Sequence, residues 1–282
     1  MRVFKQKEAL ISLLSAEKNN HKTIGLVPTM GALHKGHISL VTRALEENDL
    51  VVVSIFVNPT QFNNPEDLAK YPKTLDKDLR LLEDLNDQII IFAPSAQEMY
   101  QDNISSEKFD FDGLELQMEG KFRPGHFDGV GTIVKKLFNT IRPNRAYFGE
   151  KDYQQLQIIK KLTEKEHLDV QIIECPITRE ESGLAMSSRN ERLPEDLRIK
   201  AAFIYKTISK AKEKFNTHSI QQILDWIHDQ FNNHNDFDLE YAEIAEQKTL
   251  KSVKVKKNGE HYRLFVAVYA NDIRLIDTIA LN

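Results

Sequence analysis

The sequence predicts an α/β protein with a doubly wound parallel sheet, followed by a smaller α+β domain. Short aliphatic runs alternate with segments of helical periodicity over the first 177 residues, a pattern typical of βαβ units. One of these runs, 50–57, is almost continuously aliphatic, as expected for a parallel strand that is covered on both faces. After residue 177 the pattern changes to helices and then to alternating strands. We therefore expect two domains, 1–177 and 178–282.

The periodicity of apolar residues places the elements of the first domain in order. Pro59 ends the aliphatic run, because proline cannot donate to a strand ladder. Residues 63–74 are predicted to form a loop, and 94–127 an irregular stretch. We expect strands at 24–27, 50–57, 88–92, 145–148 and 170–174, and helices at 6–18, from 36 onward, and at 75–85, 128–141 and 152–165.

The second domain is predicted to combine two helices with a β-rich end. The helices fall within 193–232, where Ile220, Ile223 and Ile227 recur at the spacing of one helix face. Asn258-Gly259 is a strong hairpin signal, so we expect strands at 250–255 and 261–269 on either side of it.

The composition restricts the class of protein. The chain has 282 residues, of which 41% are hydrophobic and 28% charged, as in a globular protein that buries a core. Its net charge of −4 argues against broad nucleic-acid binding. The single Cys175 fits a reducing compartment, and no apolar run reaches the roughly 18 residues of a membrane span. The N-terminus is too charged for a secretory signal, so we expect a cytoplasmic protein with neither a membrane nor a nucleic-acid partner.

Polar residues collect where the predicted strands end. His34 and His37 follow the first strand at the start of a helix, whose N-terminus favours phosphate. Asn58 and Gln61 follow the second strand. Since ligands of open parallel sheets bind beyond the carboxyl ends of the strands, these residues predict a nucleotide site. Later strand ends add Gly149, Glu150, Lys151, Asp152, Gln155, Thr178 and the segment 183–190.

Several of these segments resemble motifs of known enzymes. His34-Lys-Gly-His37 is similar to the His-x-Gly-His signature of adenylate-forming nucleotidyltransferases and class I aminoacyl-tRNA synthetases. Met186-Ser-Ser-Arg189 resembles the second phosphate loop of the same superfamily. Five longer blocks, at 28–37, 56–62, 123–130, 148–155 and 183–190, resemble in the same order the pantothenate synthetase (pantoate–β-alanine ligase) family. The resemblance implies a Rossmann-like first domain and a second domain that closes over the site.

The same resemblance implies an ATP-dependent ligase of pantothenate and coenzyme A biosynthesis. In this family the pantoate carboxylate attacks the α-phosphorus of ATP and releases pyrophosphate. The β-alanine amine then attacks the pantoyl adenylate and releases AMP. The implied substrates are ATP, pantoate and β-alanine, with Mg²⁺ as cofactor, and the implied assembly is a homodimer. The metal should be held by one or two carboxylates and phosphate oxygens, and Asp78 is the candidate ligand.

The remaining roles are carried over by position from the family. His34, His37 and Lys151 are the expected catalytic residues, and His37 is the expected donor toward the α-phosphate. Gln61 and Gln155 are expected to bind pantoate, with β-alanine also near Gln61 and with Asn58 in support. The expected ATP-binding residues are Met30, Gly31, Ala32, Leu33, His34, Lys35, Gly36, His37, Gly149, Glu150, Lys151, Asp152, Thr178, Met186, Ser187, Ser188 and Arg189.

Three other functions share part of this pattern. A nucleotidylyltransferase that moves AMP onto another small acceptor would need basic residues for a phosphate-bearing acceptor, where this chain has Gln61 and Gln155. A tRNA synthetase would need a basic appended domain, against which the acidic balance argues. A non-catalytic nucleotide-binding module would be expected to have lost one of the two phosphate loops, and both are present.

Overall fold

The computed structural model describes all 282 residues, and the chain divides into two units. The first unit comprises Met1–Glu150 and Gln155–Pro176, and the second comprises Lys151–Gln154 and Ile177–Asn282. The short segment 151–154 is therefore grouped with the C-terminal unit, although it contains the first two residues of the helix Tyr153–Lys165, the rest of which belongs to the first unit.

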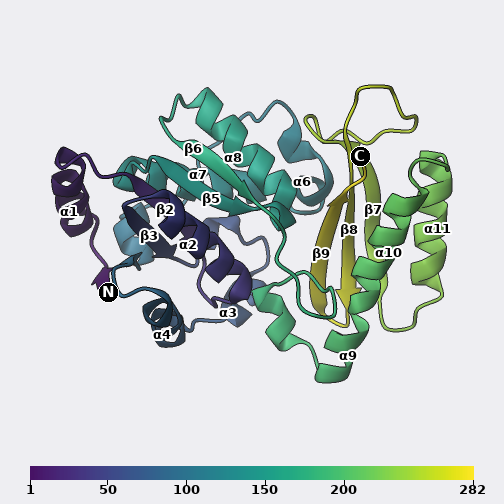
Figure 1. The fold of residues 1–282 in the computed structure, drawn as a ribbon, viewed down its shortest axis with the longest axis horizontal. Helices are drawn as coiled ribbons and strands as arrows, with labels where there is room; N and C mark the ends of the chain where they lie inside the picture. The colour runs from purple at the N-terminus through teal and green to yellow at the C-terminus, as the bar shows by residue number, and fades with distance from the viewer. The chain divides into compact units, whose positions relative to one another are not determined.

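The first unit is built on a six-stranded parallel sheet in the order β1–β4–β3–β2–β5–β6 (Figure 1). Because neighbouring strands run parallel, their carboxyl ends share one edge. The register pairs Thr29 with Ile55 at the ends of β2 and β3, and Gly149 with Cys175 at the ends of β5 and β6. The strands are β1 (Arg2–Phe4), β2 (Ile24–Thr29), β3 (Leu50–Ile55), β4 (Ile90–Phe92), β5 (Arg145–Gly149) and β6 (Gln171–Cys175).

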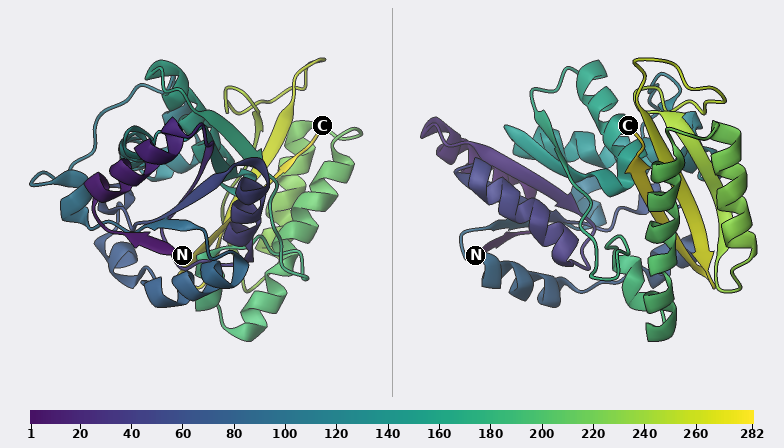
Figure 2. Two further views of the ribbon diagram at one scale, coloured as in Figure 1. Left: turned by 60° about the vertical axis from the view of Figure 1, so that its left-hand side comes forward. Right: turned by 45° about the vertical axis from the view of Figure 1, so that its right-hand side comes forward.

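Helices cover both faces of this sheet, which Figure 2 shows from two further sides. Val51 and Val53 of β3 pack in one cluster with Val41 of α2 and Leu82 of α4, and Val52 is buried as well. This two-sided burial explains the aliphatic run of β3. On another layer α1 packs against α7. The helices are α1 (Lys7–Asn19), α2 (Lys35–Glu47), α3 (Pro65–Lys70), α4 (Leu75–Leu85), α5 (Ala96–Tyr100), α6 (Met118–Phe122), α7 (His126–Ile141) and α8 (Tyr153–Lys165), with short 3₁₀ turns η1 (Pro59–Gln61), η2 (Leu114–Leu116) and η3 (Glu150–Asp152).

The order of the strands reverses at β2. From β2 the chain steps to β3 and β4 on one side, and later to β5 and β6 on the other side. The carboxyl edge between β2 and β5 is therefore the switch point, where sheets of this kind bind ligands. The predicted doubly wound class is confirmed.

The second unit pairs a three-stranded antiparallel sheet with helices. Its strands are β7 (Asp238–Glu246), β8 (Tyr262–Ala270) and β9 (Ile273–Ala280), and α11 (Ile220–Asn232) packs on β7 while α10 (Ala202–Lys214) packs on β9. Ile223 and Ile227 are fully buried, so the predicted apolar face of α11 is the core face. Short elements η4 (Ser188–Arg192) and α9 (Glu195–Lys200) precede α10.

The structure differs from the sequence prediction in several short elements. The predicted loop 63–74 contains α3, which begins after Asn64 because that side chain accepts a hydrogen bond from the backbone N–H of Glu66. The edge strand β1 was not expected. The predicted strand 250–255 is wrong: apart from a bridge between Ser252 and Ala245, the segment is irregular, and β8 pairs instead with β7. The Asn258-Gly259 turn lies in the long connection between those two strands.

Candidate active site

Two histidines begin α2 just beyond β2. His34 is the N-cap of the helix, and its ring Nδ1 accepts a hydrogen bond from the backbone N–H of Gly36 at 3.1 Å. The ring Nδ1 of His37 accepts from the backbone N–H of His34 at 3.3 Å. The two ring centroids lie 4.1 Å apart. Each ring thus accepts a hydrogen bond from a backbone N–H group that has no partner within the helix.

These contacts fix where each ring carries its proton. A ring nitrogen that accepts a hydrogen bond is unprotonated, so both imidazoles are neutral and carry their proton on Nε2. Both rings therefore have an Nε2–H group that can donate to an anion. Since the N–H of Gly36 is engaged by His34, the ring donors extend the anion-binding character of the helix N-terminus.

The loop that leads into α2 is held by one buried carboxylate. Gly31 and Ala32 both have positive φ angles, +83° and +49°. This turn aims the N–H of Ala32 at Oδ2 of Asp78, 3.0 Å away, and the N–H of Leu33 at Oδ1, 2.8 Å away. The Thr74 hydroxyl also donates to the same carboxylate. Asp78, on α4, therefore sets the conformation of the loop.

The surroundings of Asp78 do not fit a metal site. Its side chain is 1% exposed, and both oxygens accept hydrogen bonds from the loop. Burial raises the pKa of the Asp78 carboxyl, and the N–H groups of Leu33 and Ala32 oppose this shift. Moreover, no group of three or more His, Cys, Asp or Glu residues in the structure is arranged to hold a metal ion. The carboxylate is a support for the loop, and Asp76, two residues earlier, is exposed.

A second wall of polar groups follows β3. Asn58 is 1% exposed and Gln61 is 9% exposed. The Asn58 amide nitrogen donates to the backbone carbonyl of Gly129 at 3.1 Å and to Oε1 of Gln61 at 3.2 Å. The Gln61 amide nitrogen lies 2.9 Å from the sulfur of Met30. This wall therefore joins the turn η1 to α7 and to the residue after β2.

The backbone of Gln61 is held from the start of α7. Nδ1 of His126 lies 2.8 Å from the Gln61 carbonyl oxygen, which can only accept, so this nitrogen donates. Arg123 also donates to the same carbonyl, at 3.3 Å, and its other terminal nitrogen contacts Nε2 of His126. His126 is thus protonated on Nδ1, the opposite tautomer to the rings at α2. The 123–126 segment, which begins one of the five motif blocks, therefore supports Gln61.

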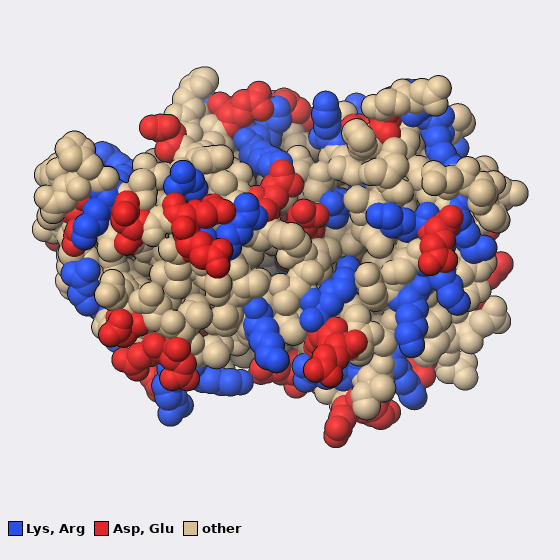
Figure 3. Space-filling model, in the orientation of Figure 1, with Lys and Arg blue, Asp and Glu red and all other residues tan.

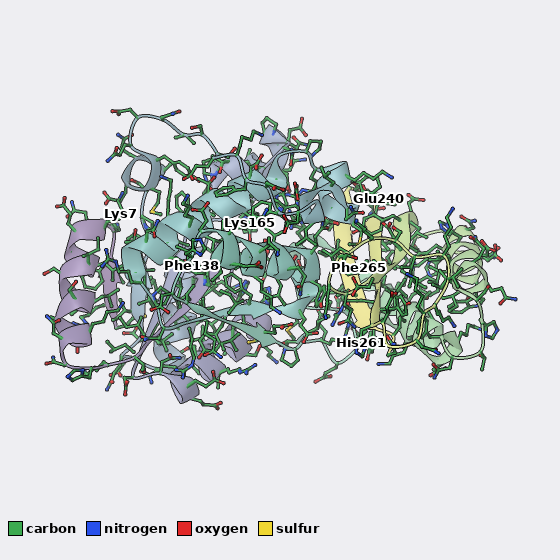
Figure 4. The ribbon with its side chains drawn as sticks, turned by 90° about the horizontal axis from the view of Figure 1, so that it is seen from above. Lys7, Phe138, Lys165, Glu240, His261 and Phe265 are labelled. Carbon is green, nitrogen blue, oxygen red and sulfur yellow. The ribbon has the colours of Figure 1, made fainter.

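The segment after β5 belongs in part to the second unit. Glu150 and Gln155 lie in the first unit, and both are half-buried. Lys151 and Asp152, whose charged groups lie 3.5 Å apart, are grouped with the second unit. Within that unit the ring of Tyr153 lies 4.0 Å from the Arg263 guanidinium and 6.0 Å from the ring of Phe265 on β8, which is labelled in Figure 4.

The 186–189 segment of the second unit lies between two sets of ion pairs. Before it, Arg179 makes two bonds with Asp277, of 2.6 and 2.9 Å, and donates to the carbonyl of Gly183. After it, the Asn190 amide donates to Glu180 at 2.9 Å, and Arg198 also pairs with Glu180. Within it, the Ser187 hydroxyl accepts from the N–H of Arg189. Met186 donates its N–H to the carbonyl of Thr178. The loop is therefore held at both ends.

Sequence reasoning missed several residues that support these groups. Tyr100, whose hydroxyl donates to Oδ1 of Asn58, belongs to none of the motif blocks, and neither do Glu180 and Asp277. Contacts between distant segments are not visible in a single sequence. One signal was available: Ser95 and Glu98 have the spacing of a helix start, and Ser95 does cap α5, which carries Tyr100.

A doubly wound sheet with ring N–H donors at its switch edge is the architecture of a nucleotide-binding α/β enzyme. Comparison with known proteins defines the family. The chain belongs to the pantoate–β-alanine ligase family, whose model matches residues 2–280.

Individual relatives resemble the chain over its whole length. A protein of Christiangramia forsetii named pantothenate synthetase is 57% identical over 282 residues, which are 100% of both chains. The crystal structure of pantothenate synthetase from Thermus thermophilus has a TM-score of 0.91 and 36% identity, and covers 100% of this chain and 99% of that one. A pantoate–β-alanine ligase from Francisella tularensis, complexed with beta-gamma ATP and β-alanine, has a TM-score of 0.77 and 36% identity, with 100% and 98% covered.

Proposed function

We propose that this chain joins (R)-pantoate to β-alanine with ATP, and forms pantothenate, AMP and pyrophosphate. The observation that carries the proposal is that Nδ1 of both His34 and His37 accepts a backbone hydrogen bond at the start of α2, from which the Nε2–H donors follow. The full-length match to a ligase family supports the choice of substrates. The two neutral amides of Asn58 and Gln61 support an anionic acid as the second substrate, since a carboxylate there would repel it.

The reaction takes two displacement steps. First, a carboxylate oxygen of pantoate bonds to the α-phosphorus of ATP, and the bond from that phosphorus to the β-phosphate bridging oxygen breaks. Pyrophosphate leaves. Second, the β-alanine amine bonds to the acyl carbon, the acyl–oxygen bond breaks, AMP leaves and the amine loses a proton to solvent. Adenylation is needed because a free carboxylate is a poor electrophile. The protein contributes positioning and charge stabilisation.

In this proposal the positive and N–H groups bind the triphosphate. His37 donates from Nε2 to the α-phosphate as charge develops there, and His34 donates to the neighbouring phosphates. Lys151 adds a point charge. The remaining ATP-binding positions are those expected from the sequence: Met30, Gly31, Ala32, Leu33, Lys35, Gly36, Gly149, Glu150, Asp152, Thr178, Met186, Ser187, Ser188 and Arg189.

The acid substrate is assigned to the amides. Gln61 and Gln155 bind pantoate through its carboxylate and hydroxyl groups, and Asn58 orients Gln61. β-Alanine approaches next to Gln61.

Three further parts of the proposal concern the setting of the reaction. Mg²⁺ would accompany the triphosphate, and Asp78 would not hold it, because both of its oxygens already accept hydrogen bonds from the loop. The active form is a homodimer in the cytoplasm. No helix is long and apolar enough to cross a membrane. Charges of both signs are interspersed over the face seen in Figure 3, which does not favour nucleic-acid binding.

The test is to measure pyrophosphate release with each substrate omitted in turn. ATP with pantoate should release pyrophosphate without β-alanine, up to about one equivalent of enzyme, and β-alanine should then allow turnover with one AMP per pantothenate. The variant His37→Ala tests the catalytic role of this residue, and it should lower turnover far more than it weakens pantoate binding. No pyrophosphate from ATP and pantoate would overturn the two-step proposal. AMP transferred intact to the acceptor as a stable product would favour a nucleotidylyltransferase.

A further inference from the structure

The polar groups behind Gln61 form a series of hydrogen bonds whose donors and acceptors are fixed. It starts at the backbone carbonyl of Gly129, which can only accept a hydrogen bond. The amide of Asn58 must therefore turn its nitrogen toward this oxygen, 3.1 Å away. The same nitrogen donates its second hydrogen to Oε1 of Gln61 at 3.2 Å. A backbone group that cannot rotate thus sets the orientation of Asn58.

The opposite side of the Asn58 amide is fixed by Tyr100. The Tyr100 hydroxyl donates to Oδ1 of Asn58 at 2.5 Å, and the Thr60 hydroxyl donates to the same oxygen at 3.2 Å. Tyr100 is 6% exposed. Burial raises the pKa of the Tyr100 phenol, which keeps its proton in place for this bond. If the Asn58 amide were turned over, its nitrogen would face the tyrosine donor and its oxygen would face the Gly129 carbonyl.

This arrangement decides which end of the Gln61 side chain is presented to a ligand. Its oxygen is engaged by Asn58, so the amide nitrogen points the other way and lies 2.9 Å from the Met30 sulfur. A thioether is a weak hydrogen-bond acceptor. A carboxylate oxygen would be a much better partner for the same N–H groups, because charge-assisted hydrogen bonds are stronger.

The packing around these hydrogen-bonded groups leaves little room for a different arrangement of their side chains. A Cβ atom on Gly129 would lie 2.3 Å from the Thr60 carbonyl oxygen, so only glycine lets α7 come this close to η1. The carbonyl of Gly129 is therefore held at a fixed distance from Asn58. The Gln61 backbone is fixed as well, by His126 and Arg123.

We propose that Tyr100 is a positioning residue that, together with the Gly129 carbonyl, locks the Asn58 and Gln61 amides in one orientation, so that Gln61 offers N–H donors and selects the carboxylate form of the acid substrate. The inference rests on the proposed function, because it takes Gln61 as a pantoate-binding group. It adds the source of the selectivity: the site discriminates by the direction of an amide, and Tyr100 sets this direction without contacting the substrate.

Tyr100→Phe tests this role with the smallest change of shape. The variant should raise the KM for pantoate about tenfold, as expected for a misdirected hydrogen bond, with the KM for ATP within about twofold of the original. As a probe of direction, pantoamide, in which a neutral amide replaces the carboxylate, is added as a competitive inhibitor. The ratio of pantoate to pantoamide affinity should fall about tenfold in Tyr100→Phe. Asn58→Asp, which accepts on both oxygens and lets Gln61 turn over, should lower the ratio further.

Tyr147→Phe is the matched control. Tyr147 is a fully buried tyrosine of the same unit whose hydroxyl also contacts an asparagine amide, that of Asn48, at 2.7 Å. The loss of the Tyr147 hydroxyl should affect the melting temperature about as much as the loss of the Tyr100 hydroxyl. It should leave the ratio of pantoate to pantoamide affinity unchanged. Equal shifts in the KM for pantoate and ATP, or an unchanged ratio in Tyr100→Phe, would overturn the inference while the proposed function stands. Wild-type protein that releases no pantoate-dependent pyrophosphate would overturn both.

Discussion

The two candidate phosphate loops are held in place by opposite means. In the first unit, the backbone of 31–33 donates to Asp78, a single anion that is almost completely buried. In the second unit, the 186–189 segment is flanked by two ion pairs, Arg179 with Asp277 and Arg198 with Glu180, of which the latter is partly exposed. The first loop depends on one acceptor, so the loss of this acceptor should displace the whole loop. Several contacts hold the second segment, so the loss of any one of them should displace it only in part.

The largest effect is expected from Asp78→Asn. An asparagine accepts with one oxygen only, so its amide nitrogen would face one of the two loop N–H groups and push the loop away from its position. Activity should fall about 100-fold, because small displacements at a reacting centre cost that much. Asp76→Asn, an exposed change on the same helix, should have almost no effect. Comparable activity of the two variants would contradict the special role of Asp78.

The difference in stability between wild type and Asp78→Asn should also depend on pH. The pKa of Asp78 is raised in the folded protein, so the protonated carboxyl contributes stability at pH values below its ordinary pKa. This contribution is lost as pH rises through the raised pKa of the folded state. The unfolding free energy of wild type should therefore decline relative to the variant as pH rises above the ordinary Asp pKa of about 4. Urea titrations at several pH values measure this difference, and a relative increase over the same range would be inconsistent with a buried, desolvated carboxylate.

A smaller effect on activity is expected from Asp277→Asn. Its side chain is 2% exposed, so the substitution leaves the Arg179 charge poorly compensated, at a cost of about 3 kcal/mol in unfolding free energy. The loop before Met186 would loosen, and the KM for ATP should rise about tenfold. The control is Asp272→Asn, which removes an exposed pair with Arg192 in the same unit. An unchanged KM for ATP in a folded Asp277→Asn protein would show that the Arg179–Asp277 pair does not hold the loop in place.

The smallest effect is expected from Arg198→Ala. The Arg198 side chain is 45% exposed, and pairs of this kind contribute about 0.2–1 kcal/mol. Asn190 keeps its bond to Glu180 in this variant, so the loop retains its second attachment. The KM for ATP should rise by less than about threefold, and the difference from wild type should shrink further in high salt. A loss as large as that of Asp277→Asn would remove the distinction between the two attachments.

The sequence predicted the parts of this molecule that depend on local pattern. The β2 and β3 strands, the start of α2 and the helix α4 follow directly from aliphatic runs, turn residues and periodicity. The family of the chain also followed from short motifs, and the comparisons confirm it.

The supporting contacts could not be predicted in this way. Asp78 was read as a metal ligand, because nothing local indicates that its carboxylate meets the backbone of Ala32, 46 residues earlier. Tyr100 lay in a stretch predicted to be irregular, and its bond to Asn58 spans 42 residues. The predicted 250–255 strand failed for a related reason: the Asn-Gly turn signal is local, whereas strand pairing is decided by which segments meet across the sheet.

The distances along the chain also suggest an order of folding. The ring caps of His34 and His37 bridge only two or three residues, so they form as soon as α2 does. The bond from Asn58 to Gly129 closes a loop of 71 residues, and it cannot form before α7 has docked. We expect a chain in which α7 is undocked to keep helix α2 with its histidines in place, while Asn58 lacks its bond to Gly129. Hydrogen exchange at the N–H groups of α2 and α7 should then report two separate openings, and only the second should abolish pantoate binding.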